Sequence, residues 1–201
     1  MILENKLGID NQVDLARAEE KLSKQKAKQL FDSGDIHKAE VGTFGGLSFI
    51  HAYLFGDIYH FAGMVRDVNI AKGHFRFASV LYLQAALKHI DAMPQGSFDE
   101  IIEKYVEMNV AHPFREGNGR ATRIWLDLML KKGIRQVVDW NWVDKSEYLS
   151  AMQRSVVKDM EIKALLKQAL TDQVDDRALF MKGIDVSYYY EGYSEFKTSE
   201  L

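Results

Sequence analysis

One stretch of sequence decides how this chain folds and what it can do: residues 112–123, which read HPFREGNGRATR. Proline disfavours helix in the residue before it, so we expect a helix to end near His112 and a tight loop to follow. Gly117 and Gly119 allow backbone turns that other residues resist. From Ala121 onward the apolar residues return at helical spacing, so the loop leads into a second helix.

The loop has the chemistry of a phosphate site. Free backbone N–H groups at a helix start bind anions, and Arg120 and Arg123, one turn apart, present guanidinium groups that suit phosphate. Glu116 would repel phosphate unless a divalent cation lay between them, and Mg²⁺ is commonly held by one or two carboxylates plus phosphate oxygens. We therefore predict a nucleoside triphosphate site, with His112 at its entrance as a base of ordinary pKa about 6.5.

The residues before the loop support a catalytic interpretation. Phe98, Ile102, Tyr105, Asn109 and His112 step by three and four, so they share one face of a helix. That face is apolar for three turns and becomes polar only at its last two members. The pattern places Asn109 beside His112, at the mouth of the predicted phosphate loop.

Residues 112–123 resemble the signature H-P-F-x-[DE]-G-N-G-R-x-x-R of Fic domains, and the resemblance extends from about Gly42 to Gly192. It implies an all-α fold, a helical bundle with a short β-hairpin flap over the active site, and a single domain over residues 1–201. The implied activity is transfer of AMP from ATP to a tyrosine, serine or threonine hydroxyl of a target protein. His112 would be the base and Glu116 the ligand of Mg²⁺ or another divalent cation. The nucleotide would contact Lys72, Asn109, Gly117, Asn118, Gly119, Arg120 at the β-phosphate and Arg123 at the γ-phosphate.

A second segment looks like the flap of this family. Alternation over residues 64–77, interrupted by Lys72-Gly73, predicts a β-hairpin. An exposed strand edge can pair with an extended peptide, which suits the implied role of docking a target protein. The docking residues would be Ile70, Lys72, Gly73, His74 and Phe75.

A third segment, SYYYEG at residues 187–192, resembles the autoinhibitory motif [ST]-x-x-x-E-[GN] of the same family. The resemblance implies a C-terminal inhibitory helix, about residues 185–195, that presents Glu191 to Arg123. Ser187 lies at i, i+4 from Glu191, so we expect it to brace the glutamate. Self-modification would fall on one of the three tyrosines between them, Tyr188, Tyr189 or Tyr190.

Other patterns predict further helices. One runs over about residues 11–32, with a face rich in lysine and glutamate that we interpret as solvated. The remaining predicted helices cover residues 78–93, 98–112, 118–132 closed by Gly133, 144–157, 160–171, 175–182 and a short one from residue 185.

Composition sets limits on the partners. The 201 residues carry a net charge of −3, which gives no electrostatic case for nucleic acid. Cysteine is absent and no apolar run reaches membrane-spanning length, so we expect a cytoplasmic protein without a membrane partner. The expected partners are ATP, a target protein docked on the flap and, because members of this subclass can self-associate, a second copy of the chain.

Three alternatives stay open at this stage. The same site could remove AMP, with Glu191 orienting a water molecule. Another nucleotide or phosphoryl donor could replace ATP, because no adenine-pocket motif is legible. The chain could also be a non-catalytic module that binds a nucleotide or a partner, although the intact His112 and Glu116 argue against this. A P-loop NTPase is not supported, because the pattern G-x-x-x-x-G-K-[ST] does not occur.

Overall fold

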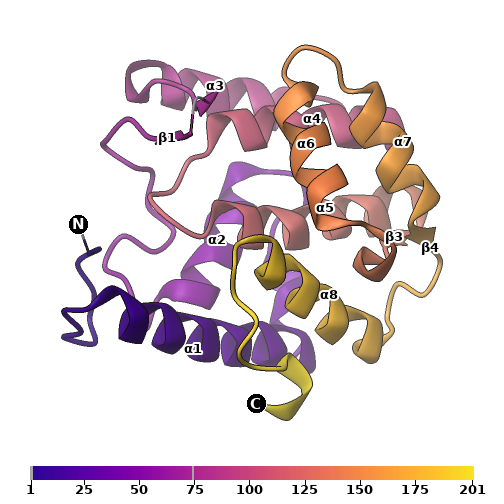
Figure 1. The fold of residues 1–201 in the computed structure, drawn as a ribbon. Coiled ribbons are helices and arrows are strands. Elements are labelled where there is room, and N and C mark those ends of the chain that lie inside the picture. The colour runs from indigo at the N-terminus through magenta and orange to yellow at the C-terminus, as the bar shows by residue number, and fades with distance from the viewer. Residues whose placement is uncertain (1, 74) are drawn as a thin grey trace.

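The structure is a computed structural model that describes residues 2–73 and 75–201. Helices dominate it (Figure 1). In chain order they are α1 (Gln12–Asp32), α2 (Phe44–Phe55), α3 (Val80–Ala92), α4 (Phe98–Ala111), α5 (Asn118–Ile134), α6 (Lys145–Ser155), α7 (Met160–Gln168) and α8 (Arg177–Tyr190). Short 3₁₀ turns occur at Asp35–Lys38, Trp140–Trp142 and Thr198–Glu200.

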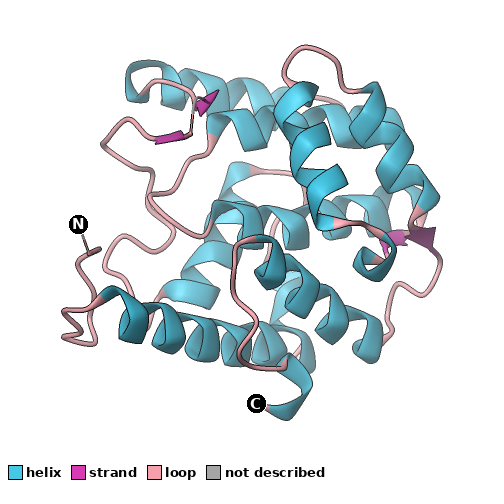
Figure 2. Cartoon of the chain, in the orientation of Figure 1, coloured by secondary structure: helices cyan, strands magenta, loops and turns pink. Residues whose placement is uncertain are grey.

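Two small antiparallel strand pairs accompany the helices. β1 (Ala71–Lys72) pairs with β2 (Phe75–Arg76), and β3 (Val137–Val138) pairs with β4 (Leu170–Thr171). Figure 2 shows each pair as a minor addition to a bundle of helices. The predicted all-α fold with a short hairpin is confirmed. Within the described residues, no helix is both long and apolar enough to span a bilayer.

Helix α5 positions the site because it runs through the middle of the molecule (Figure 1). It packs against α2, α4 and α8, and the side chains of Ala121, Trp125 and Leu126 are completely buried. Trp125 Nε1 donates a hydrogen bond to the carbonyl of Thr43, the N-cap residue of α2, at 3.0 Å. These contacts fix the N-terminus of α5, where the loop of residues 112–117 ends.

The predicted ends of two helices need correction. α5 does not close at Gly133: it continues to Ile134, and Arg135 takes the left-handed conformation with φ 55°. Gly133 lies inside the helix, and packing accounts for the glycine, because a Cβ there would approach Ile101 Cδ1 to 2.9 Å. The predicted helix 160–171 ends at Gln168, because the following residues form β4.

The two helices predicted at residues 175–182 and 185–195 are one continuous helix, α8, and Glu191 is its C-cap residue rather than an interior position. The sequence pattern breaks at Gly183, but the structure does not. Gly183 packs closely against Trp140, where a Cβ would lie 3.2 Å from the indole ring. The glycine therefore serves helix packing and not helix termination.

The face of α1 that we interpreted as solvated is partly buried. Glu19, Glu20 and Lys24 are each no more than 2% exposed. The C-terminal tail after α8 crosses this face, where Lys24 Nζ donates to the carbonyl of Phe196 at 2.6 Å. The charged residues of α1 are thus internal partners for the end of the chain.

The flap is shorter than predicted, because only residues 71–72 and 75–76 pair as strands. Arg66, which we placed in a strand, is 3% exposed and donates hydrogen bonds to four backbone carbonyls, those of Val68, Ala78, Ala111 and His112, at 2.5–3.1 Å. The last carbonyls of a helix lack partners within the helix. Arg66 therefore caps α4 and joins the base of the flap to the loop.

Replacing Arg66 with methionine should lower the free energy of unfolding by at least about 2 kcal/mol, because buried carbonyls would lose their donors. Urea unfolding followed by circular dichroism measures this loss. Arg154→Met is the matched control: its guanidinium forms an exposed ion pair with Glu161, so stability should change little. Equal losses in the two variants would contradict the capping role.

Candidate active site

The loop between α4 and α5 is held by hydrogen bonds between its own residues and by a buried phenylalanine. α4 ends with His112 in a left-handed conformation, φ 48°. Phe114 is completely buried, and its ring stacks on His51 with centroids 3.8 Å apart. The Asn118 side chain donates to the carbonyl of Phe114 and accepts from its N–H, each at 2.8 Å.

This use of Asn118 differs from the prediction. We expected its amide to bind a phosphate oxygen, but both of its polar atoms are engaged by the Phe114 backbone, and Asn118 is 4% exposed. The groups that remain for an anion are the first-turn N–H groups of α5, which have no partners within the helix. Gly117, with φ 76°, begins this turn, and a Cβ there would lie 2.5 Å from the Phe55 ring.

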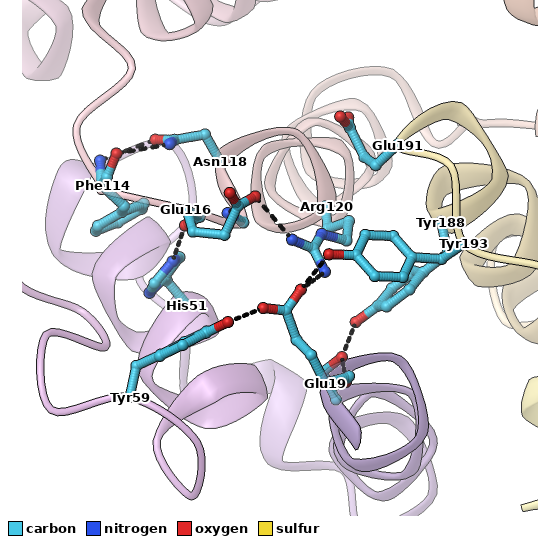
Figure 3. A network of polar contacts seen from close by, with 12 residues as sticks. Glu19, His51, Tyr59, Phe114, Glu116, Asn118, Arg120, Tyr188, Glu191 and Tyr193 are labelled. Atoms are coloured by element: carbon cyan, nitrogen blue, oxygen red, sulfur yellow. Dashed lines mark hydrogen bonds and ion pairs between the residues drawn. The ribbon is translucent and has the colours of Figure 1, made fainter. Parts of the chain in front are cut away.

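His51 supports the loop from below, as Figure 3 shows. Its Nδ1 accepts a hydrogen bond from the N–H of Gly63 at 2.9 Å, and its Nε2 donates to the carbonyl of Glu116 at 2.8 Å. Burial lowers the pKa of His51 to about 4, so the ring stays neutral.

Most of the predicted site residues line one pocket of about 560 Å³. They come from the flap, the end of α4, the loop, α5 and the end of α8. They are Ile70, Lys72, Phe75, Asn109, His112, Glu116, Gly117, Asn118, Gly119, Arg120, Arg123 and Glu191. Gly73 lies in the flap turn with φ 60° and does not line the pocket, and His74 lies outside the described residues.

A second cavity, of about 290 Å³, lies between α5 and α8 and is lined mainly by apolar side chains such as Ile124, Leu128 and Phe180. His112 and Glu116 are not among its lining residues. The pocket that His112 and Glu116 line is therefore the candidate active site.

His112 has the orientation of a base. Its Nδ1 lies 3.3 Å from the carbonyl oxygen of Asn109, which can only accept, so Nδ1 carries the proton and Nε2 keeps its lone pair. The imidazole stacks on Phe77 with centroids 3.7 Å apart. Burial lowers the pKa of His112 to about 4, and Arg66 and Lys72 act in the same direction. The ring is therefore neutral near pH 7 and able to accept a proton.

Glu116 is held at the pocket edge. Its Oε1 accepts hydrogen bonds from Arg120 Nη2 at 3.0 Å and from the N–H of Gly117 at 2.9 Å. Arg120 is 1% exposed, and its Nη1 donates to Glu19 Oε1 at 2.5 Å. We expected Arg120 to grip a β-phosphate, but in this structure both terminal nitrogens are engaged by carboxylates, Nη1 by the buried Glu19 and Nη2 by Glu116 at the pocket edge.

Arg123 is joined to α8 as the sequence motif predicted. Its Nη2 forms an ion pair with Glu191 Oε1 at 2.8 Å. Ser187, however, does not brace Glu191: its Oγ accepts from Arg123 Nε at 2.6 Å and its carbonyl accepts from Arg123 Nη2 at 2.9 Å. Ser187, on α8, therefore binds Arg123 directly and not Glu191.

Glu191 also contacts the flap. Its Oε2 lies 3.3 Å from Lys72 Nζ on β1. Burial opposes ionisation of Glu191, but Arg123 and then Lys72 outweigh it and lower the pKa of the carboxyl to about 2. A Cβ at Gly119 would approach Glu191 Oε1 to 2.4 Å. Glycine at this position is what lets the glutamate reach the start of α5.

Two of the three tyrosines predicted as self-modification sites are inaccessible. Tyr188 is 1% exposed and its hydroxyl donates to Ser23 Oγ, whereas Tyr190 is 3% exposed and donates to the carbonyl of Val143. Both point into the core because α8 packs along this side of the bundle. Tyr189 is 53% exposed and is the accessible member of the set.

Sequence analysis missed three residues that shape the site. Glu19 pairs with Arg120, Arg66 caps the end of α4, and the hydroxyl of Tyr148 accepts from Arg123 Nη1 at 3.4 Å. All three belong to segments outside the signature. A charged residue on a helical face or in a loop gives no local signal that the folded chain will bury it.

Glu116 can supply one carboxylate ligand to a divalent cation. Arg120 and Gly117 both bind Oε1, and the side chain of Glu116 is 44% exposed toward the pocket. Across the described residues, no cluster of three or more histidine, cysteine, aspartate or glutamate side chains could hold a metal by itself. A single carboxylate suits a cation whose other ligands are phosphate oxygens and water.

Comparison with known proteins identifies the family. The model of the Fic/DOC family matches residues 45–130, which include the flap, His112 and the loop. Protein adenylyltransferase VbhT of Bartonella schoenbuchensis is 29% identical over 199 residues, covering 92% of this chain and 40% of VbhT. Probable protein adenylyltransferase Fic of Salmonella typhimurium is 27% identical over 184 residues, covering 85% of this chain and 88% of that protein.

The fold agrees with this assignment. The crystal structure of BepC from Bartonella tribocorum, with bound AMPPNP, superposes with a TM-score of 0.68 and 20% identity, over 86% of this chain and 94% of that one. Residues 45–130 therefore match a Fic domain. The chain spans less than half the length of VbhT but most of the length of the Salmonella protein.

The low pKa of His112 can be measured by NMR. We expect its ring carbon proton to titrate near pH 4, because burial disfavours the charged ring. Phe77→Ala removes the stacked ring and exposes the imidazole, so the pKa should rise toward 6.5. The pKa of His51, which does not touch Phe77, should stay near 4 and serves as the internal control. Titration of His112 near pH 6.5 in the unaltered protein would contradict the account.

Proposed function

We propose that the protein is a nucleotidyltransferase that transfers AMP from ATP to a hydroxyl group of a target protein, and that Glu191 inhibits it. The observation that carries this proposal is the meeting of three groups in one pocket: a neutral His112, the first turn of α5, and the Arg123–Glu191 ion pair. Relatives named protein adenylyltransferase, and a BepC crystal structure that contains AMPPNP, support the choice of reaction and nucleotide.

In the proposed complex the triphosphate lies along the first turn of α5. The N–H groups of this turn bind phosphate oxygens, and Arg123, once released from Glu191, binds the γ-phosphate. Glu116 would hold a divalent cation, such as Mg²⁺, whose positive charge offsets that of the phosphates. Arg120 stays paired with Glu19 and Glu116 and contributes positive charge to the pocket wall without direct contact to the phosphates.

The proposed AMP transfer requires one proton transfer. The target hydroxyl gives its proton to Nε2 of His112 while its oxygen forms a bond to the α-phosphorus. The bond between the α-phosphorus and the bridging oxygen breaks, and pyrophosphate leaves. Asn109 holds the Nδ1 proton throughout, so His112 remains correctly oriented. Most of the rate would come from positioning and charge stabilisation.

The flap is proposed to dock the target. Ile70, Lys72 and Phe75 line the pocket next to His112, and β1 and β2 form a two-stranded ribbon with unpaired outer edges among the described residues. A target segment that adds to such an edge would present its hydroxyl to the base.

Removal of AMP is the second candidate function, and one observation favours it. Glu191 lines the same pocket as His112 and is ionised, because the pKa of its carboxyl is lowered to about 2. An ionised carboxylate at this place could orient a water molecule toward a modified hydroxyl. The two activities are distinguished by the variant described next.

Glu191→Gly should increase AMP transfer at least tenfold, because Arg123 becomes available to the γ-phosphate. Breaking an enclosed pair commonly costs about 3–5 kcal/mol, and here the cost falls on the inhibited state. Mass spectrometry after incubation with ATP and Mg²⁺ detects the added adenylyl group, which we expect on Tyr189 if the protein modifies itself. Glu191→Gly/His112→Ala is the control and should lose the product by about 10²–10⁴-fold.

An unchanged or lower rate in Glu191→Gly would reject autoinhibition. If that variant instead loses an activity that removes AMP from a modified protein, Glu191 is a catalytic residue for the second function. Retained turnover in the double variant would show that His112 is not the base.

Lys72 tests whether the flap holds the inhibitory glutamate or the nucleotide. The lysine side of its ion pair with Glu191 is exposed, so Lys72→Met should raise AMP transfer only about twofold to threefold and should not lower ATP affinity. Arg76→Met, on the second strand of the flap, should leave both quantities unchanged. Stopped assays of pyrophosphate release, with ATP titrated, measure the two. A fall in ATP affinity for Lys72→Met would make the lysine a nucleotide ligand instead.

A further inference from the structure

Glu19 is a buried carboxylate that the proposed reaction does not use. It lies on α1, outside the residues matched by the family model, and is 2% exposed. It accepts hydrogen bonds from Tyr59, from Tyr193 at 2.8 Å and from Arg120 at 2.5 Å. Figure 3 shows these donors converging on Glu19. Burial alone would favour the protonated acid, but Arg120 and the two tyrosines outweigh it and lower the pKa of Glu19.

Arg120 connects this interior carboxylate to the pocket. One terminal nitrogen binds Glu19 and the other binds Glu116, on the opposite side of the guanidinium (Figure 3). The arginine is fixed in place between aromatic rings, with Phe55 at 4.9 Å and Tyr193 at 4.7 Å from its guanidinium carbon. Two carboxylates therefore share one positive charge that cannot move away from them.

The two carboxylates differ in what surrounds them. The side chain of Glu19 is 2% exposed and that of Glu116 is 44% exposed. Because Glu19 balances the charge of Arg120 from the interior, Glu116 keeps a net negative charge toward the pocket. Without Glu19, the guanidinium would be balanced by Glu116 alone.

We propose that Glu19 is a positioning residue that acts through Arg120 to keep Glu116 available to the divalent cation that accompanies the nucleotide. The proposal rests on the proposed function only for the assumption that a metal–nucleotide complex binds this pocket. Loss of the Glu19 charge would draw Glu116 toward Arg120 and would make the electrostatic potential at the cation more positive. Both effects weaken cation binding.

The test measures binding and not turnover. The ligand is α,β-methylene ATP, whose bridging carbon prevents cleavage at the α-phosphorus, and the background is Glu191→Gly, in which Arg123 is free. Isothermal titration calorimetry gives the affinity with Mg²⁺ and with EDTA, and the ratio of the two is the metal enhancement. We expect Glu19→Gln to reduce this enhancement at least fivefold and to leave the affinity in EDTA no lower than that of the background.

Glu20→Gln is the matched control. Glu20 is the next residue of α1 and is equally buried, at 2% exposed, but it binds Lys24 and the backbone of the tail instead of Arg120. It should leave the metal enhancement unchanged. An unchanged enhancement in Glu19→Gln, or an equal fall in both variants, would overturn the proposal. Because binding is measured, a protein that transfers no AMP still gives an answer, and the proposed function can fail separately.

If Glu19→Gln does not fold, Tyr193→Phe keeps the proposal falsifiable. This variant removes one hydrogen bond from Glu19 but leaves its charge, so the Glu19 carboxylate binds Arg120 more strongly. Glu116 then competes less well for Arg120. The metal enhancement should then equal or exceed that of the background. A fall in enhancement for Tyr193→Phe would show that the network serves only the packing of the tail.

Discussion

The contact between Arg123 and the last turn of α8 is the interaction on which the rest of the structure depends. Arg123 is 3% exposed, and a guanidinium at that depth must have acceptors for its hydrogen atoms. α8 supplies them through the hydroxyl and carbonyl of Ser187 and the carboxylate of Glu191. Helix α8 is therefore part of the folded core, and Arg123 is stable in the interior only while these acceptors are in place or other acceptors replace them.

Two further buried arginines link the loop to distant parts of the chain. Arg66 joins the flap segment to the end of α4, and Arg120 joins the loop to α1. Each is bound in part by groups that lie far from it in sequence, Arg66 by the carbonyl of Ala111 and Arg120 by Glu19. The short loop between α4 and α5 is thus held from the flap, from the N-terminal helix and from the C-terminal helix.

Under the proposed function, this arrangement would keep a reactive site in check. His112 is neutral and correctly oriented without any ligand, because burial and Asn109 fix its protonation and its ring. The base needs no assembly step. In the proposed mechanism, the contact that changes on activation is the pairing of Arg123, because Glu191 and a γ-phosphate would compete for the same guanidinium. The low pKa of Glu191 means that mild acid does not release it: the carboxyl would have to be protonated, and the stability that its pairing contributes is lost only as the pH falls toward about 2.

The sequence predicts the parts of this site that have local causes. Proline, glycine and helical periodicity define the loop and both flanking helices, and the two Fic motifs pair Glu191 with Arg123. The sequence does not predict the contacts between segments that are far apart in the chain. The periodicity of α1 shows a charged face, but whether water or the C-terminal tail covers Glu19 depends on the tertiary fold. Gly183 reads as a helix break because its propensity is poor, although packing against Trp140 keeps α8 continuous. Ser187 shares a helical face with Glu191, yet Arg123 is the stronger partner because it is charged.

The most direct test of the central claim compares ATP with ADP, which differ by the γ-phosphate alone. Isothermal titration calorimetry with Mg²⁺ should show nearly equal affinities for the two nucleotides in the unaltered protein, because Glu191 occupies Arg123. In Glu191→Gly combined with His112→Ala, which prevents turnover, ATP should bind at least tenfold more tightly than ADP, a difference of about 1.4 kcal/mol. The same ratio of affinities in both proteins would contradict the claim that Glu191 and the γ-phosphate compete for Arg123.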